Sequence, residues 1–187
     1  MKQRFKFETE KVLHSILFIL QNLGGRSDFH KIFKILYFAD QKHLVTYGFP
    51  ITGDVYIAME YGPVPSQTYD NLKSVKKEKP ESVYSSFLDI QNDQVIAKKQ
   101  ADMEELAESD VAFLSSSIKE NKDLTFDQLT IKSHQYAWKK NYIGFYNPSE
   151  ISVMDIADEV GIDQAMKDYI SLNIENEQFL ENHGELR

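Results

Sequence analysis

Residues 50–70 read PITGDVYIAMEYGPVPSQTYD, and the fold is best read outward from this stretch. From Asp54 to Tyr61 the side chains alternate with a period of two, in a run rich in β-branched and aromatic residues, which predicts a strand. One face carries Val55, Ile57 and Met59, and the other carries Tyr56, Ala58 and Glu60. Gly62-Pro63 is expected to break this strand, and a helix is predicted from Ser66 through Ser74.

The strand closes on Tyr-Gly-Pro-Val-Pro at residues 61–65. Pro63 and Pro65 each fix their own φ angle. Each proline also favours extended geometry in the residue before it, which is Gly62 or Val64. The segment is therefore predicted to be a rigid corner.

The flanking segments read as helices. Apolar residues recur at helical spacing from Val12 to Leu20, and Gly24-Gly25 stops that helix. Ser27 or Asp28 can cap a second helix, from about Phe29 to Thr46. Its segment IFKILYFA is apolar on nearly every side, so this is predicted to be the central, buried helix.

The second half of the chain adds a hairpin and more helices. Runs at 83–90 and 94–98 flank Gln91-Asn92-Asp93 as a hairpin, so three short strands are expected to form one small sheet. Ser109 is expected to cap a helix, and a capping box of Thr125 with Gln128 opens another that runs through Lys140. Two terminal helices, 151–160 and 163–180, are predicted to break near Gly161. The predicted fold class is α+β and mainly α-helical: a compact helical domain with a small antiparallel β-sheet of about three short strands packed on it.

Composition limits the function classes. The chain has 187 residues, 42% hydrophobic and 12% aromatic, which is enough for one domain with a sizeable core. It has no cysteine, which excludes disulfides and thiolate metal sites and suits the cytoplasm. No targeting segment is recognisable, and the longest dense apolar run, Val12 to Leu20, is too short to span a bilayer. We expect a cytoplasmic protein without membrane contact.

The formal net charge of −8 counts against nucleic acid as the main partner, because phosphate binding relies on Lys and Arg. The densest lysine cluster comprises Lys73, Lys76, Lys77 and Lys79, with Glu78 and Glu81 among them. This cluster is interpreted as the solvated end of a helix.

The histidines do not form a recognisable catalytic or metal-binding motif. They are His14, His30, His43, His134 and His183, and no HExxH or short His/Asp cluster includes them. His134 and Trp138 are four residues apart and are predicted to share a helix face, with the histidine packed on the tryptophan. Asp40 and His43 are interpreted as a structural polar pair.

No metal, no cofactor and no enzymatic activity are predicted from these residues. The alternatives are a small enzyme with His134 or His43 as its acid–base group, or a DNA-binding regulator.

Three motifs occur in one order: KILYFAD at residues 34–40, PITGD at 50–54 and YGPVP at 61–65. Ser133-His134 and then Trp138 follow later in the chain. This ordered set resembles the Panacea (SocA-like) antitoxin domain, which is found in prokaryotes and their phages. The likeness spans residues 10–145.

The resemblance implies an antitoxin of a toxin–antitoxin system, which neutralises a cognate toxin by direct protein–protein contact. It also implies a cytoplasmic protease as a second partner, where the antitoxin is an adaptor that presents its toxin for degradation. It divides the chain into a Panacea-like domain, residues 1–150, and a C-terminal helical extension, residues 151–187, packed on the same domain.

The rigid corner at residues 61–65 has properties that suit a surface for binding another protein. A pre-organised segment loses little entropy when a partner docks on it, and tyrosines are enriched among residues that dominate binding energy. The predicted partner-binding residues are Tyr56, Tyr61, Gly62, Pro63, Val64 and Pro65. The alternative is that the corner only turns the chain from strand to helix and seats Tyr61 in the core.

Overall fold

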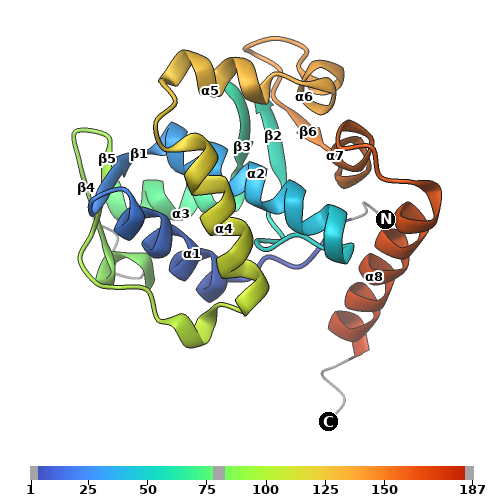
Figure 1. Cartoon of the computed structure of the whole chain (residues 1–187), viewed down its shortest axis with the longest axis horizontal. Coiled ribbons are helices and arrows are strands. Elements are labelled where there is room, and N and C mark those ends of the chain that lie inside the picture. Colours follow the sequence, from blue (N-terminus) through green and yellow to red (C-terminus); the bar gives the residue numbers. More distant parts are fainter. Residues whose placement is uncertain (1–3, 78–82, 184–187) are drawn as a thin grey trace.

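The computed structural model describes residues 4–77 and 83–183 and confirms the predicted fold class, a mainly helical α+β domain (Figure 1). Its α-helices are α1 (Thr9–Asn22), α2 (Phe29–Tyr47), α3 (Ser66–Lys76), α4 (Glu108–Asn121), α5 (Phe126–Ser133), α6 (Tyr136–Asn141), α7 (Val153–Glu159) and α8 (Gln164–His183). Its strands are β1 (Arg26–Asp28), β2 (Tyr56–Met59), β3 (Gly62–Pro65), β4 (Leu88–Gln91), β5 (Gln94–Ala97) and β6 (Ser149–Ile151). Two short 3₁₀ helices are η1 (Val83–Ser86) and η2 (Met103–Glu105).

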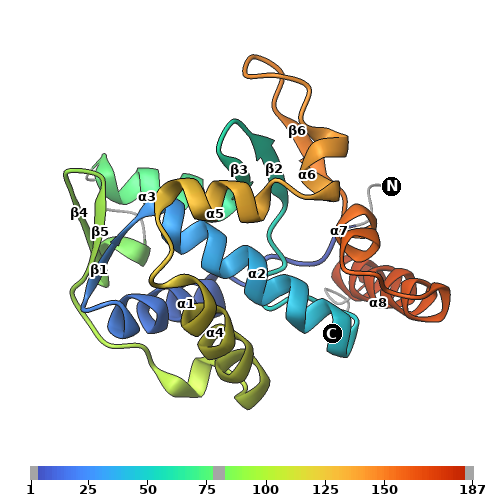
Figure 2. The ribbon, with the colours of Figure 1, turned by 45° about the horizontal axis from the view of Figure 1, so that its top comes forward.

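Helix α2 is the central helix, as predicted, with α1, α4 and α5 around it (Figures 1 and 2). Asp28 caps its start by accepting a hydrogen bond from the Lys31 backbone N–H at 2.8 Å, and Gly48 ends it at a φ of 75°. Residues 32–41 are all buried. A buried hydrogen bond of 2.7 Å from the Ser117 hydroxyl to the Ile35 carbonyl ties α4 to it.

The strands form two antiparallel sheets, each of three strands, in the orders β1-β5-β4 and β3-β2-β6. The two sheets lie apart in Figure 2, on different sides of the α2 helix. The predicted hairpin is confirmed: its two-residue turn has Asn92 and Asp93 at φ angles of 50° and 60°, as a type I′ turn requires. The strand predicted at 54–61 belongs to the other sheet, so the three expected strands divide between two sheets.

The predicted strand does end before Gly62-Pro63, but the segment that follows is itself a strand, which was not predicted. The chain reverses at Glu60-Tyr61 and returns as β3, where Ala58 pairs with Pro63 and Tyr56 pairs with Pro65. Because β3 is the edge strand of its sheet, the missing N–H groups of the two prolines are tolerated. Gly62 follows the turn at a φ of 100°, a conformation that favours glycine.

Two predicted helix boundaries also differ. The N-cap of α4 is Ala107 and not Ser109, because the Asp110 carboxylate accepts a hydrogen bond from the Ala107 backbone N–H at 3.0 Å. The helix predicted from Thr125 to Lys140 opens with its capping box but breaks after α5. His134 and Gln135 leave helical geometry, with ψ angles of 54° and −158°, and α6 then starts in a new direction.

Four short elements, β1, η1, η2 and β6, were not predicted as they occur. Residues 83–86 form the η1 helix instead of the first part of a strand. The β6 strand has three residues, too few for an alternating pattern to be recognisable.

The chain after residue 150 contacts the rest of the structure at several places. Strand β6 pairs with β2, and the break between α7 and α8 at Gly161 is confirmed. The Glu159 carboxylate accepts hydrogen bonds from the Tyr37 hydroxyl, the Gln41 amide and the Ala137 backbone N–H at 3.1, 2.5 and 2.7 Å. The division of the chain at residue 150 stays a prediction. None of the described helices combines the length and the apolar character needed to cross a membrane.

Candidate functional site

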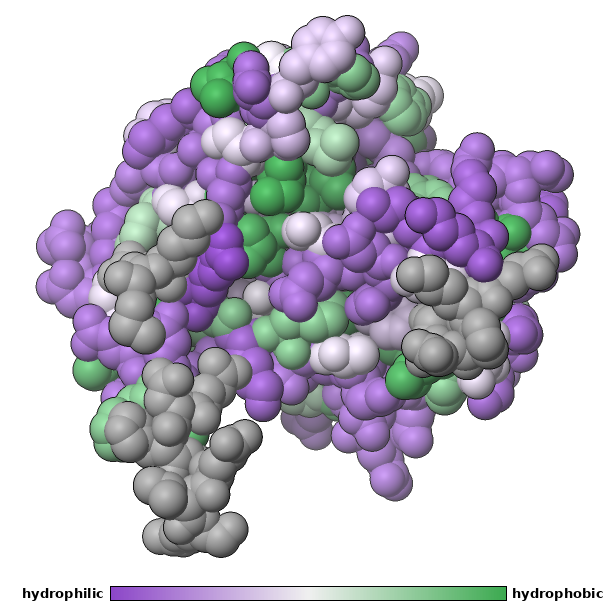
Figure 3. Space-filling view, turned by 180° about the vertical axis from the view of Figure 1, so that it is seen from behind, coloured by the Kyte–Doolittle hydropathy of each residue, from purple (hydrophilic) through white to green (hydrophobic). Residues whose placement is uncertain are grey.

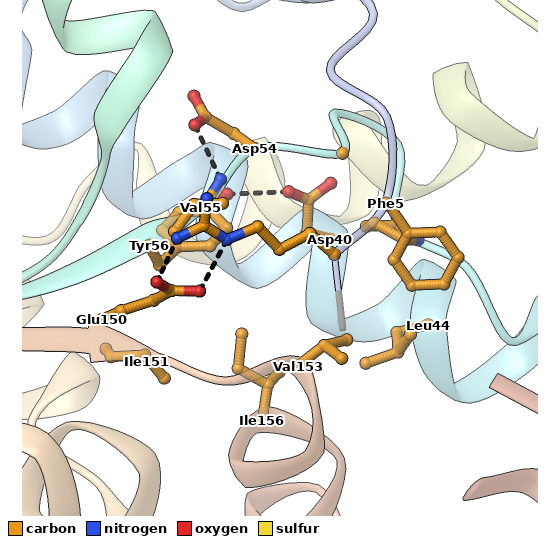
Figure 4. Close-up of a pocket in the computed structure, with 13 residues that line it drawn as sticks. Phe5, Asp40, Leu44, Asp54, Val55, Tyr56, Glu150, Ile151, Val153 and Ile156 are labelled. Atoms are coloured by element: carbon orange, nitrogen blue, oxygen red, sulfur yellow. Dashed lines mark hydrogen bonds and ion pairs between the residues drawn. The ribbon is translucent and has the colours of Figure 1, made fainter. Parts of the chain in front are cut away.

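Two hollows adjoin β2 and differ greatly in size. The smaller, between the N-terminal segment, α2 and α7 (Figure 4), has about 40 Å³, close to the volume of about 30 Å³ that one water occupies in the liquid. The larger has about 310 Å³, which is within the size range of ligand pockets. It is the better candidate for a binding site, and it is called the aromatic groove below.

The aromatic groove lies along the β2–β3 hairpin. Aromatic side chains from five segments line it: Phe29 and Phe33 of α2, Tyr61 of the hairpin turn, Tyr69 of α3, Phe126 of α5, and Tyr142 and Phe145 between α6 and β6. Three polar side chains, His30, Lys34 and Glu60, also line it. In Figure 3, hydrophobic surface gathers in a hollow over β2 and β3, and hydrophilic side chains frame it.

The wall beside α2 is preformed. Phe29, Phe33 and Tyr69 meet edge to face in all three pairs, with ring centroids 5.7 to 6.2 Å apart. Such mutual packing fixes the rings before any partner arrives. A partner that docks here therefore meets ordered aromatic surface.

Three side chains contact backbone carbonyl groups of every second residue of the β2–β3 hairpin. The indole N–H of Trp138 donates to the Met59 carbonyl at 2.8 Å. His30 Nε2 lies 3.3 Å from the Tyr61 carbonyl, and Lys34 Nζ donates to the Pro63 carbonyl at 2.9 Å. These contacts join α2 and α6 to the hairpin, so its turn is fixed along the groove.

The six predicted partner-binding residues separate into two groups. Tyr61 is 52% exposed, with its ring edge-to-face on Phe126 at 5.2 Å, and half-buried Val64 also lines the groove. The other four, Tyr56, Gly62, Pro63 and Pro65, are buried in the structure of the free chain. The alternative that Tyr61 is a core residue is wrong, because half of its surface meets solvent. Partner binding itself stays a prediction.

Burial determines the electrostatics of the groove floor. The Lys34 side chain is 1% exposed, and this burial lowers its pKa from 10.5 to about 7. Burial, followed by the nearby charge of Lys34, lowers the pKa of His30 from 6.5 to about 4. The floor of an otherwise apolar groove therefore holds an amino group that titrates near neutral pH.

The acidic residues of the KILYFAD and PITGD motifs, Asp40 and Asp54, have structural roles at the smaller hollow (Figure 4). The Asp40 carboxylate accepts hydrogen bonds from the Ile51 and Thr52 backbone N–H groups and from the Thr52 and Tyr56 hydroxyls. The Asp54 carboxylate accepts the Gln67 and Thr68 backbone N–H groups at the start of α3 at 3.0 and 2.8 Å. Together they fix the 50–55 segment, and through Tyr56 they place β2.

The histidines considered as acid–base groups make structural contacts. The predicted polar pair of Asp40 with His43 is wrong, because both side chains contact other groups. His43 Nδ1 lies 2.7 Å from the Phe49 carbonyl, and its Nε2 lies 3.2 Å from the Ser109 hydroxyl. The ring is fully buried.

His134 stacks on Trp138 with ring centroids 3.5 Å apart and an angle of 2° between the planes. The predicted contact is confirmed, although the two residues lie on either side of the helix break. Across residues 4–77 and 83–183, no group of His, Asp and Glu side chains is placed to hold a metal ion.

The lysine cluster at the end of α3 is partly paired. Lys73 and Lys76 contact Asp70 and Asp93 at 2.7 and 2.5 Å, and Lys79 lies outside the described residues. These acidic partners reduce the positive field that a nucleic acid would need.

Sequence reasoning missed most of the groove. Phe29, Phe33, Phe126 and Phe145 come from segments far apart in the chain, and no local pattern joins them. Lys34 did leave a signal, since it is the only charged residue in the otherwise apolar run at 32–39.

A comparison with protein families identifies one match. The model of the family described as "Antitoxin SocA-like, Panacea domain" matches residues 32–139, which is more than half of the chain and lies within the predicted likeness at 10–145. No curated protein and no solved structure matches the chain. The match includes α2 from Ile32 onward, the β2–β3 hairpin, Phe126 and Trp138, and thus the central part of the groove. The chain therefore belongs to the SocA-like antitoxin family with a Panacea domain.

Proposed function

We propose that this chain is the antitoxin of a toxin–antitoxin pair and neutralises its cognate toxin in the cytoplasm by direct binding at the aromatic groove. The proposal rests on one observation above the others. In a member of an antitoxin family, the hairpin carrying the family-like YGPVP motif forms one wall of a preformed groove of about 310 Å³.

The groove has the composition of a protein-binding surface. Tyr61 and Phe126 are 52% and 46% exposed and contact each other at the groove, and Phe145, which also lines it, is 66% exposed. Clustered aromatic residues that keep such exposure gain much free energy when a partner covers them. Tyr61 and Val64 would contact the toxin, whereas Gly62, Pro63, Pro65 and Tyr56 would hold them in place.

The other predicted functions have less support. Neither His43, fully buried, nor His134, stacked on Trp138, lines the aromatic groove in the way a general acid or base would. A DNA-binding role would need a basic surface, and the α3 lysines are paired with acidic residues. A role as a protease adaptor is compatible with toxin binding at the groove. The test below distinguishes this role from neutralisation by binding alone.

The test is co-expression with the product of the adjacent gene, which should be toxic when expressed alone. We expect this chain to restore growth and to co-purify with the toxin at a fixed ratio. A toxin that stays at full level inside the complex indicates sequestration, and a toxin that disappears in a protease-dependent manner indicates an adaptor. Rescue without co-purification at unchanged toxin level would contradict direct binding.

A further inference from the structure

Lys34 is a buried lysine on the floor of the aromatic groove, and its positive charge has no counter-ion. Its side chain is 1% exposed, and Nζ donates to the Pro63 carbonyl at 2.9 Å. An ammonium group has three N–H donors. In the part of the chain that the structure describes, Pro63 is its only hydrogen-bond acceptor and no ion pair includes it. One neutral carbonyl does not compensate for removing an ammonium group from water.

The surroundings of Lys34 are themselves basic. His30 Nε2 lies 3.1 Å from the Thr130 hydroxyl on one side. On another side, His134 Nε2 is buried and has no hydrogen-bond partner within residues 4–77 and 83–183. The charge of Lys34 lowers the pKa of both imidazoles, after the larger effect of burial. Three basic groups therefore gather beneath the hairpin.

The other charged groups nearby do not neutralise this cluster. The charge of Asp28 raises the pKa of His30, and the charge of Lys139 lowers the pKa of His134. Glu60, which lines the groove, is exposed. None of them forms an ion pair with Lys34 in the described structure. When Lys34 carries its proton, an anionic group that would pair with it has to come from outside the described structure.

We propose that Lys34 anchors an acidic side chain, Asp or Glu, that the toxin inserts into the aromatic groove. This inference rests on the proposed function and names the chemistry of its partner. The aromatic walls would cover the apolar part of the inserted segment, and the carboxylate would accept the two remaining N–H groups of Lys34. Such charge-assisted hydrogen bonds are strong in apolar surroundings, and a neutral side chain of the same shape would leave the ammonium unpaired.

Pairing of Lys34 with a carboxylate should also be accompanied by uptake of a proton. Because burial lowers the pKa of Lys34 to about 7, the amino group is mostly neutral at pH 8. A bound carboxylate favours the charged form, so complex formation at pH 8 should take up close to one proton. Binding that relies on aromatic contacts alone would take up none through Lys34.

The first test needs no toxin and uses 3-phenylpropionate, with the neutral 3-phenylpropanamide as the matched control. We expect the acid to shift the amide NMR signals of Tyr61 and Gly62 saturably, and the amide to bind at least tenfold more weakly. Lys34→Met should abolish this discrimination while the spectrum keeps its dispersion. Equal binding of acid and amide by the wild-type chain, or binding of neither, would overturn the proposal even if the variant does not fold.

The second test uses the toxin. Calorimetry at pH 8 in two buffers of different ionisation enthalpy measures the protons taken up, and we expect close to one for the wild type and none for Lys34→Met. A toxin that binds without proton uptake contradicts the role of Lys34 but leaves the proposed function intact. A toxin that does not bind at all contradicts the proposed function, while the phenylpropionate test still judges the site.

Discussion

Replacing Lys34 with methionine should make the fold more stable at neutral pH. The substitution keeps the length of the side chain and removes the buried amino group. The pKa of Lys34 is lowered from 10.5 to about 7, and each pKa unit corresponds to about 1.4 kcal/mol, so burial disfavours the charged form by about 5 kcal/mol. Loss of the hydrogen bond to the Pro63 carbonyl opposes the gain by about 1–3 kcal/mol. The net stabilisation at pH 7 should be about 2 kcal/mol or more.

The sign of the pH dependence follows from the proton balance. Between pH 7 and 10.5 the unfolded chain holds a proton on Lys34 that the folded chain has lost. The unfolding free energy of the wild type therefore rises with pH in this window, by about 3–4 kcal/mol between pH 7 and pH 10. Lys34→Met lacks this rise, so the advantage of the variant should shrink as the pH increases.

Urea unfolding, followed by the fluorescence of Trp138 at pH 7, 8, 9 and 10, measures both effects. Lys119→Met, which removes an exposed lysine of α4, controls for the loss of one positive charge. If wild type and Lys34→Met show parallel pH profiles, the amino group is not the buried, unpaired group described above. A variant that is more stable but fails to bind toxin would show that Lys34 is retained for binding.

Two further substitutions test how the groove is supported. Asp40→Asn replaces a buried carboxyl whose pKa burial raises from 3.8 to about 6. The wild-type unfolding free energy should therefore fall by about 2 kcal/mol as pH rises from 4 to 7, and urea unfolding should show no such fall in the variant. Gly62→Ala places a Cβ 2.3 Å from the Ser133 hydroxyl at a φ of +100°, and should destabilise more than Gly144→Ala, which has a similar φ of +114° and open space. The strained backbone accounts for about 1–3 kcal/mol in both, so equal unfolding midpoints would show that the hairpin is not tightly packed there.

The helices could be predicted because their signals are local. Asp28 and Gly48 mark the two ends of α2, and the apolar run between them indicates its burial. The family likeness was also recognisable, because its motifs are short and ordered. The β3 strand was missed because two prolines in four residues count against a strand unless it lies at a sheet edge, and sheet order depends on the whole fold.

The groove could be predicted only in part. Tyr61 was identified from its place at the corner, but the sequence does not show that Phe126, 65 positions later, lies against it. Tyr56 was placed in the same surface, and the structure instead points its hydroxyl at Asp40, because β2 turns that face inward. Both the contact between Tyr61 and Phe126 and the inward direction of Tyr56 depend on packing between residues far apart in the sequence.

The toxin affinity of Tyr61→Ala, measured beside its stability, tests the central claim that the aromatic groove is the toxin-binding surface. Tyr169→Ala on α8 is the matched control, because the two tyrosines are 52% and 46% exposed and Tyr169 lies outside the groove. We expect Tyr61→Ala to lose about 2 kcal/mol or more of binding free energy, roughly 30-fold in Kd, and to unfold near the wild-type urea midpoint. Tyr169→Ala should keep wild-type affinity. Wild-type affinity in a folded Tyr61→Ala protein, or equal losses in both variants, would contradict the assignment of the groove.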